Sequence, residues 1–133
     1  MRLAVRLVLA MVFVIAGINH FRHPAGFIRI VPPVFPAPGA LVAVSGAAEM
    51  LGGLGLLIRR VRRPAGWGLI ALVISVFPAN VYMLQHDIPL GNTPIPRLLL
   101  WLRLPVQALL IWLVWWAAVA PGARRPGERV AGR

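Results

Sequence analysis

Residues 41–58 read LVAVSGAAEMLGGLGLLI, an apolar run with one ionisable side chain, Glu49, near its middle. An ionised carboxylate at the centre of a bilayer costs roughly 2.5–3.5 kcal/mol, so such groups usually face the interior of a helix bundle and find a partner there. The neighbours of Glu49 at helical spacing are all small: Ser45, Gly46, Gly52 and Gly53. Small residues let another helix approach closely in a membrane, so this face and its carboxylate are predicted to lie against protein.

The rest of the chain has the composition of a membrane protein. It has 133 residues, is 59% hydrophobic with a mean hydropathy of +0.81, and contains only three acidic residues. Apolar stretches at about 3–20, 41–58, 67–84 and 98–120 are each long enough to be considered as spans. We therefore expect an all-α fold: a four-helix transmembrane bundle in one domain, 1–120, with a Pro-rich extracytoplasmic loop between the first two helices.

The basic residues predict the orientation of this bundle. All fourteen are Arg, which hints at a GC-rich bacterial source. Ten of them flank one side of the predicted spans, at positions 2, 6, 59, 60, 62, 63, 124, 125, 129 and 133. Because positive charge favours cytoplasmic loops, both termini are predicted to be cytoplasmic in a bacterial inner membrane, with 121–133 forming an Arg-rich cytoplasmic tail.

Composition also argues against several other functions. The net charge of +11 does not indicate nucleic-acid binding, because the Arg residues flank spans and are not interleaved with aromatics on one soluble surface. The tail is instead predicted to contact anionic lipid headgroups. The first apolar segment has no persuasive small-x-small cleavage site and is interpreted as a retained span. With no cysteine, a thiolate nucleophile, a disulfide relay and a Cys-ligated cluster are excluded for this chain.

The predicted orientation allows the depths of polar residues on all four helices to be compared. His20 falls at the outer end of the first helix and Asn80 in the outer part of the third. Arg103 and Gln107 share one face of the fourth helix, four residues apart. With Glu49, these residues predict a polar site that opens outward and handles protons or a ligand. A purely structural role, in which Glu49 holds helices together, stays open.

Two partnerships are expected within this site. An Arg103–Glu49 pair would keep the acid ionised, whereas burial without a partner favours the neutral carboxyl; alternatively, Arg103 extends to the outer headgroups. His20 could exchange protons with a carboxylate, hydrogen-bond a quinone-like carbonyl, or cap the first helix. The three His residues lack the close spacing of a metal site, so no metal is expected.

Proline residues predict where the helices bend and where the loop is rigid. Pro78 and Pro105 each remove an amide donor within a predicted span, so kinks are expected there, with Asn80 and Gln107 close enough to help the freed carbonyls. The loop 24–40 is rich in both proline and apolar residues. We expect it to cap the outer end of the bundle, with a short helix around Ala25 to Ile30.

Several short motifs together resemble one known family. They are Gly17-Ile18-Asn19-His20-Phe21 with Pro24; Ile30-Val31-Pro32-Pro33 with Phe35 and Pro36; Ser45, Gly46, Glu49, Gly52 and Gly55; Phe77-Pro78-Ala79-Asn80 with Tyr82; and Arg103, Pro105, Gln107 with the Trp112 to Trp116 cluster. From about Gly17 to Trp116 the chain resembles the DoxX-like membrane proteins. The resemblance implies a small four-helix membrane protein, associated in some members with thiosulfate:quinone oxidoreductase or with complexes that handle oxidative or thiol stress.

Two functional hypotheses from different classes follow, with a structural scaffold as a third. In the first, the chain is an accessory or anchoring subunit that binds a quinone or other lipophilic molecule for a partner redox enzyme. In the second, it is a self-contained enzyme or carrier for a small hydrophobic substrate in the same site. The sequence does not decide whether there is catalysis, nor the oligomeric state.

Overall fold

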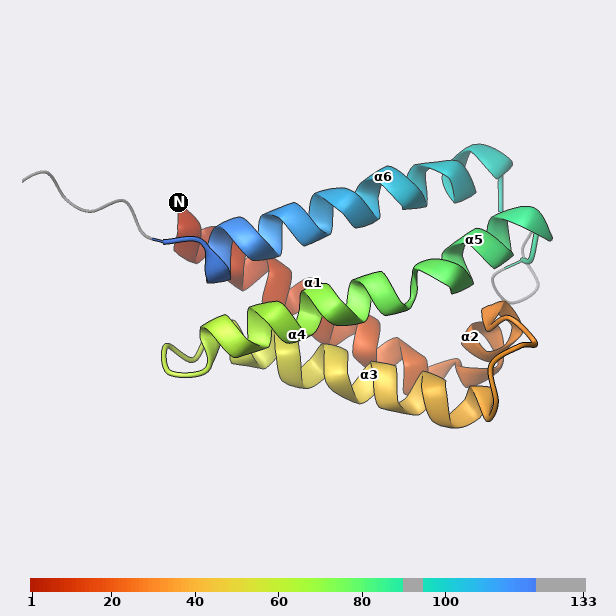
Figure 1. Cartoon of the computed structure of the whole chain (residues 1–133), viewed down its shortest axis with the longest axis horizontal. Helices are drawn as coiled ribbons and strands as arrows, with labels where there is room; N and C mark the ends of the chain where they lie inside the picture. The colour runs from red at the N-terminus through yellow and green to blue at the C-terminus, as the bar shows by residue number, and fades with distance from the viewer. Residues whose placement is uncertain (90–94, 122–133) are drawn as a thin grey trace, which may run out of the picture.

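The computed structural model describes residues 1–89 and 95–121, and this part of the chain is helical, without strands. The long helices lie roughly side by side, with α1 crossing behind the others (Figure 1). The predicted tail lies outside the described residues, except for Pro121. The all-α class expected from the apolar runs is therefore confirmed.

The elements follow one another with short connections. The first is α1 (Arg2–Arg22), followed by the short α2 (Pro24–Ile30) and by α3 (Pro38–Gly55). A basic turn leads to α4 (Arg62–Ser75) and then α5 (Phe77–Gln85). The last helix, α6 (Arg97–Val114), widens into a π-helical turn, η1 (Trp115–Val119). The short helix expected near Ala25 to Ile30 is confirmed as α2, which begins with a proline in its first turn.

Three helical segments are long and apolar enough to cross a membrane. They are Arg2–Arg22, Arg62–Gln85 and Arg97–Val119, with mean hydropathies of 2.0, 1.8 and 1.8. The helix that carries Glu49, α3, is not among them. An acid and several glycines lower the hydropathy of α3, and it ends at Gly55, short of the predicted boundary. The chain is thus compatible with a membrane protein that has three such helices.

The first and third helices make the closest backbone approach in the fold. A Cβ built on Gly17 would lie 2.5 Å from the carbonyl oxygen of Gly46, and one on Gly53 would lie 3.0 Å from that of Ala10. The other side of α3 meets α4, where a Cβ on Gly52 would lie 2.6 Å from Leu69. The small-residue face predicted around Glu49 therefore lies against protein, as expected.

The third predicted span is divided in two. Pro78 cannot donate to the helix ladder, and the chain separates at Val76 into α4 and α5. The break expected at Pro78 is therefore confirmed, whereas Pro105 remains inside α6.

The bundle has two ends, which we name by what they contain. The terminal end holds Met1, η1 and the turn between α3 and α4; the α2 end holds α2 and the connection between α5 and α6 (Figure 1). Buried side chains form one cluster toward the terminal end, including Leu9, Leu56 and Val114, and a second at the α2 end. The second cluster comprises Ile30, Met83, Leu84 and Leu100. Space remains between the two clusters.

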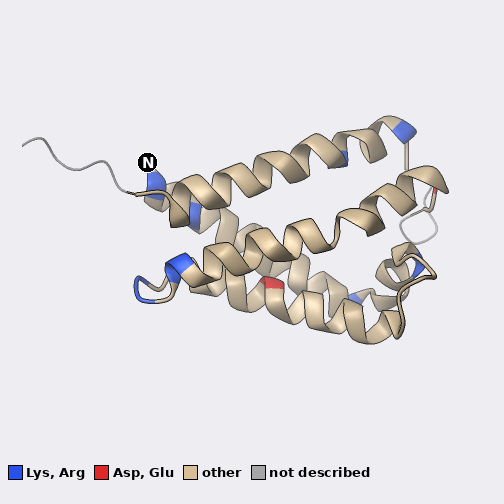
Figure 2. Cartoon of the chain, in the orientation of Figure 1, with Lys and Arg blue, Asp and Glu red and all other residues tan. Residues whose placement is uncertain are grey.

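Arginine side chains join the first and last helices at the terminal end. Arg6 Nε donates to the carbonyl of Ala117 at 2.7 Å, and Arg2 donates to that of Ala120 at 3.0 Å. These carbonyls belong to the last helical turn, where no intrahelical donor follows, so the arginines act as C-terminal caps from another helix. Figure 2 shows Lys and Arg positions gathered at this end, with fewer toward the α2 end.

Candidate functional site

A cavity of about 640 Å³ lies between the α1–α3 pair on one side and α4, α5 and α6 on the other. Ligand pockets usually have roughly 300–1,000 Å³, apolar walls and a few placed polar groups. The walls here are mostly apolar. The polar residues that line the cavity are His20, Ser45, Glu49, Ser75, Asn80, Arg103 and Gln107.

His20 is fixed at the end of α1 by polar contacts at one ring nitrogen and by an aromatic ring packed against it. Its Nδ1 lies 3.0 Å from the carbonyl oxygen of Val42, an acceptor, so this nitrogen carries the proton and donates. Phe27 of α2 covers the ring, with a centroid distance of 4.0 Å. The hydroxyl of Ser45 lies 3.2 Å from the same nitrogen and itself donates to the Leu41 carbonyl at 2.8 Å. The ring is therefore held in one orientation, with Nε2 directed away from α3's backbone.

Glu49 faces His20 across a short gap. Its Oε2 lies 3.6 Å from His20 Nε2, and the two side chains are 15% and 10% exposed. That distance exceeds a direct hydrogen bond. Oε2 is buried and has no hydrogen-bond partner among the described residues. A buried polar atom without a partner costs roughly 1–3 kcal/mol, so Oε2 is a place where a ligand atom would be stabilising.

The opposite wall carries a second polar pair. Asn80 Nδ2 of α5 donates to Gln107 Oε1 of α6 at 3.0 Å. Gln107 Nε2 in turn donates to the carbonyl of Val73, in the last turn of α4 before the break. The amide of Gln107 thus holds the broken helix and α6 together. It donates to the carbonyl of Val73, so the help expected from the sequence for a carbonyl near the break is given there.

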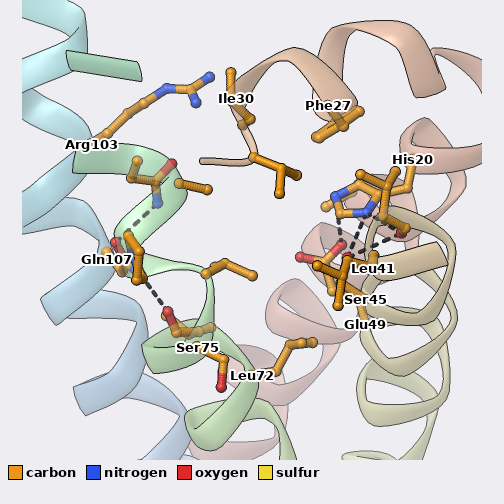
Figure 3. A pocket seen from close by; sticks show the side chains of 18 of the residues that line it. His20, Phe27, Ile30, Leu41, Ser45, Glu49, Leu72, Ser75, Arg103 and Gln107 are labelled. Atoms are coloured by element: carbon orange, nitrogen blue, oxygen red, sulfur yellow. Dashed lines mark hydrogen bonds and ion pairs between the residues drawn. The ribbon is translucent and has the colours of Figure 1, made fainter. Parts of the chain in front are cut away.

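Arg103 lies on this second wall and does not pair with Glu49. In Figure 3 the two side chains come from opposite sides of the cavity, with Arg103 extending toward Ile30. Its NH1 donates to the sulfur of Met83 at 3.4 Å. The expected Arg103–Glu49 pair is therefore wrong, because the close contact of α1 and α3 puts an imidazole, and not a guanidinium, next to the acid.

All five residues predicted for the site line the same cavity, although they come from two separate clusters. His20 and Glu49 form one, and Asn80, Gln107 and Arg103 belong to the other wall (Figure 3). Sequence reasoning missed Ser45 as a partner of His20 and Phe27 as its cover. Ser45 is four residues before Glu49, so its place on the same face was visible, but its link to His20 depends on the helix contact.

The chemistry of these groups suits an organic ligand. The described part of the chain contains no group of three His, Cys, Asp or Glu side chains placed to hold a metal ion. The cavity instead offers a carboxyl, an imidazole, two amides and a guanidinium on apolar walls. Such groups bind hydroxyl and carbonyl oxygens, while the walls accommodate hydrocarbon.

Fold and site together define a helical protein with segments able to cross a membrane and with a polar-ended apolar cavity inside. A family model described as Domain of unknown function (DUF8561) matches residues 9–118, and the chain belongs to this family. No curated protein and no solved structure matches it.

The DoxX resemblance drawn from the sequence is therefore wrong. The motifs that carried it combine glycines, prolines and aromatics in apolar helices with a few polar residues, among them His20, Glu49, Asn80, Arg103 and Gln107. Close helix packing, helix breaks and interfacial anchoring require such residues in many small membrane proteins, so the motifs reflect shared physics rather than shared family.

Proposed function

We propose that this protein is an integral membrane protein that binds a lipophilic small molecule, with the polar end of the ligand at His20 and Glu49. The observation that carries the proposal is the buried Glu49 Oε2, which lacks a partner on the wall of a cavity of about 640 Å³. Apolar walls favour a hydrocarbon-rich ligand, and Oε2 favours a group that donates a hydrogen bond.

The proposal includes four spans, with α3 as the fourth. Although α3 falls short as an independent span, it lies between α1 and α4 and is covered by both through its glycines. Both termini are proposed to be cytoplasmic, in a bacterial inner membrane. The basic residues of α1 and of the turn before α4 support this orientation because they gather at the terminal end (Figure 2).

The two atoms that face each other between His20 and Glu49 indicate which kind of polar group the ligand carries. Because Nδ1 donates to the Val42 carbonyl, Nε2 of a neutral His20 has only a lone pair. An ionised Oε2 also has only lone pairs, so the two atoms repel unless a proton lies on one of them. A ligand group that donates a hydrogen bond can therefore be accepted by either atom.

A quinone or quinol headgroup fits this description best. A phenolic hydroxyl can donate to Oε2 or to His20 Nε2, and a quinone oxygen can accept a hydrogen bond when either group carries a proton there. The 3.6 Å gap is too long for a direct bond but can be bridged by such an oxygen at its edge. The redox-enzyme partner suggested by the DoxX resemblance is not part of this proposal, because the resemblance is wrong.

Native mass spectrometry with lipidomics on protein purified in mild detergent tests the proposal. Glu49→Gln is the variant of choice, because glutamine keeps the size of the side chain and can donate to His20 Nε2. Loss of a charged hydrogen bond is expected to weaken retention of the ligand about tenfold or more. Ser75→Ala is the matched control, since Ser75 lines the cavity but already donates to its own helix, to the Ala71 carbonyl at 2.8 Å.

A lipophilic molecule that is retained by the wild type and by Ser75→Ala, and lost from Glu49→Gln, would support the proposal. An unchanged lipid profile in a folded Glu49→Gln variant would overturn it. If that variant instead loses a co-purifying protein, Glu49 serves partner docking or helix packing.

A further inference from the structure

The cavity is covered at the α2 end of the bundle. Ile30, at the end of α2, is 9% exposed and packs with Met83 and Leu84 of α5. Phe27 and Ile30 lie over the cavity in Figure 3, above the His20–Glu49 pair. Within the described residues α2 is adjacent to α1, α3 and α5, so it lies across the end of the bundle. A ligand that came from the aqueous side would have to displace this helix and its packing.

The side of the bundle between α3 and α5 is different. These two helices are not adjacent anywhere in the described part of the chain, although α3 and α4 are. The contact between α3 and α4 runs through Gly52 and Gly55 toward the terminal end. Toward the α2 end, after the break before Pro78, the chain continues as α5, which does not lie against α3. The cavity therefore reaches the lateral surface of the bundle at this level.

The rim of this lateral opening is exposed and largely apolar. On α3, Leu41 is 43% exposed and Val44 67% exposed, and both line the cavity. Across from them Ser75 and Pro78 are exposed lining residues. The Ser75 hydroxyl donates within its own helix, so this side offers little that would attract water. In the proposed membrane orientation the rim faces the acyl chains.

We propose that the ligand enters from within the bilayer, between α3 and α5, and keeps a hydrocarbon tail in this opening. This inference rests on the proposed function and adds the ligand class: an amphiphile with one polar ring or head, which stays at Glu49, and an aliphatic chain, which leaves between Val44 and Pro78. A compact hydrophobic substrate without a tail would not need the opening.

Binding in lipid nanodiscs tests the inference with two tritium-labelled probes, a benzoquinone bearing a decyl chain and the same ring without the chain. Val44→Trp places a larger side chain in the opening between α3 and α5. Leu51→Trp is the matched control, because Leu51 lies on the same face of α3 seven residues on, is 71% exposed and does not line the cavity. Val106→Trp is the second comparison, since Val106 lines the cavity from α6 and is 50% exposed.

The expected result is that Val44→Trp weakens binding of the decyl probe about tenfold, equivalent to losing the burial of roughly two methylene groups. Binding of the ring alone should remain at the wild-type level, and Leu51→Trp should leave both probes unaffected. A diazirine at the end of the chain should label the α3 and α5 rim. Val44→Phe, a smaller change with the same expected direction, serves if the Trp variant does not fold.

Four results would contradict the inference or the proposed function on which it rests. Equal binding of the decyl probe by wild type and Val44→Trp would exclude the opening between α3 and α5. A selective loss in Val106→Trp would place the tail between α1 and α6 instead. If the wild type binds neither probe while another lipid co-purifies in a Glu49-dependent manner, the quinone headgroup is wrong; if nothing is bound at all, the proposed function fails as well.

Discussion

Gly17 and Gly46 bring the backbones of α1 and α3 into direct contact, since a Cβ on Gly17 would lie 2.5 Å from the Gly46 carbonyl oxygen. Each glycine is followed three residues later, on the same helix face, by one member of the polar pair: His20 after Gly17, and Glu49 after Gly46. The approach of the two glycines therefore sets the 3.6 Å separation of the imidazole and the carboxyl group. The packing of α1 on α3 and the geometry of the candidate site therefore both depend on the contact between Gly17 and Gly46.

Gly17→Ala should destabilise the protein. The new methyl group would meet both the Gly46 carbonyl and the Met50 side chain, and backbone cannot move aside as a flexible side chain can. We expect a loss of about 1–3 kcal/mol in the free energy of unfolding. Gly68→Ala is the control, because nothing lies within 4 Å of a Cβ at Gly68 and alanine favours a helix. Reversible unfolding in mixed micelles measures both; equal stabilities would refute the close contact.

His20 and Glu49 should be energetically coupled. His20→Phe keeps a ring against Phe27 and leaves the Val42 carbonyl bonded to Ser45. It removes the imidazole, which is the polar group nearest to Oε2 among the residues that the structure describes. That variant should be destabilised, and adding Glu49→Gln should recover part of the loss, with a coupling of about 1–2 kcal/mol in a double-mutant cycle. Additive effects of the two substitutions would show that the pair does not interact.

Gln107→Leu should weaken the connection between α6 and the broken helix. Leucine matches the volume but leaves the Val73 carbonyl and the Asn80 amide without their partners. We expect a cost of about 2 kcal/mol, and faster hydrogen exchange of amides around the α4–α5 break. Ser75→Ala, which removes only a bond within α4, should change neither quantity. A stable Gln107→Leu variant with unchanged exchange would mean that Gln107 does not hold the break.

The proposed orientation predicts the behaviour of fusions to the last residue, Arg133. A fluorescent protein that folds only in the cytoplasm should be fluorescent there, and alkaline phosphatase should be inactive. Phosphatase fused after Asp87, in the connection beyond α5, should be active. The reverse pattern would place the C-terminal fusion outside, and an active phosphatase at both positions would exclude the single span that the proposal puts between Asp87 and Arg133.

Much of the helical layout could be predicted from the sequence, because long apolar runs have few alternatives to helix. The small residues around Glu49 gave its face correctly, and Pro78 gave the position of the break. The expected span at 41–58 is weaker than the others, because the acid and the glycines that indicate close packing also lower the hydropathy of α3 as a span of its own.

The site was only partly predictable for a physical reason. Depth along a helix follows from residue number, so His20, Glu49, Asn80 and Gln107 could be assigned to one polar site that opens outward. Which of them touch depends on the distance between helices, and this was set by Gly17 against Gly46. Judged by residue number alone, Arg103 and His20 were equally good partners for Glu49. The sequence contained no measure of the distance between the helices. What binds in the cavity stays a prediction.

The arginine caps at the terminal end have a consequence for biosynthesis. Arg2 and Arg6 emerge first from the ribosome, yet the carbonyls that they bind, at Ala120 and Ala117, belong to the last turn of the described chain. The α1–α3 hairpin can pack through its glycines while the rest is still being translated. The hydrogen bonds between α1 and the last helical turn, however, can form only after that turn has been translated. A chain that stops before Ala117 would contain every residue that lines the cavity. It would still lack the hydrogen bonds that join α1 to the last helical turn, and this difference distinguishes an unfinished chain from a complete bundle.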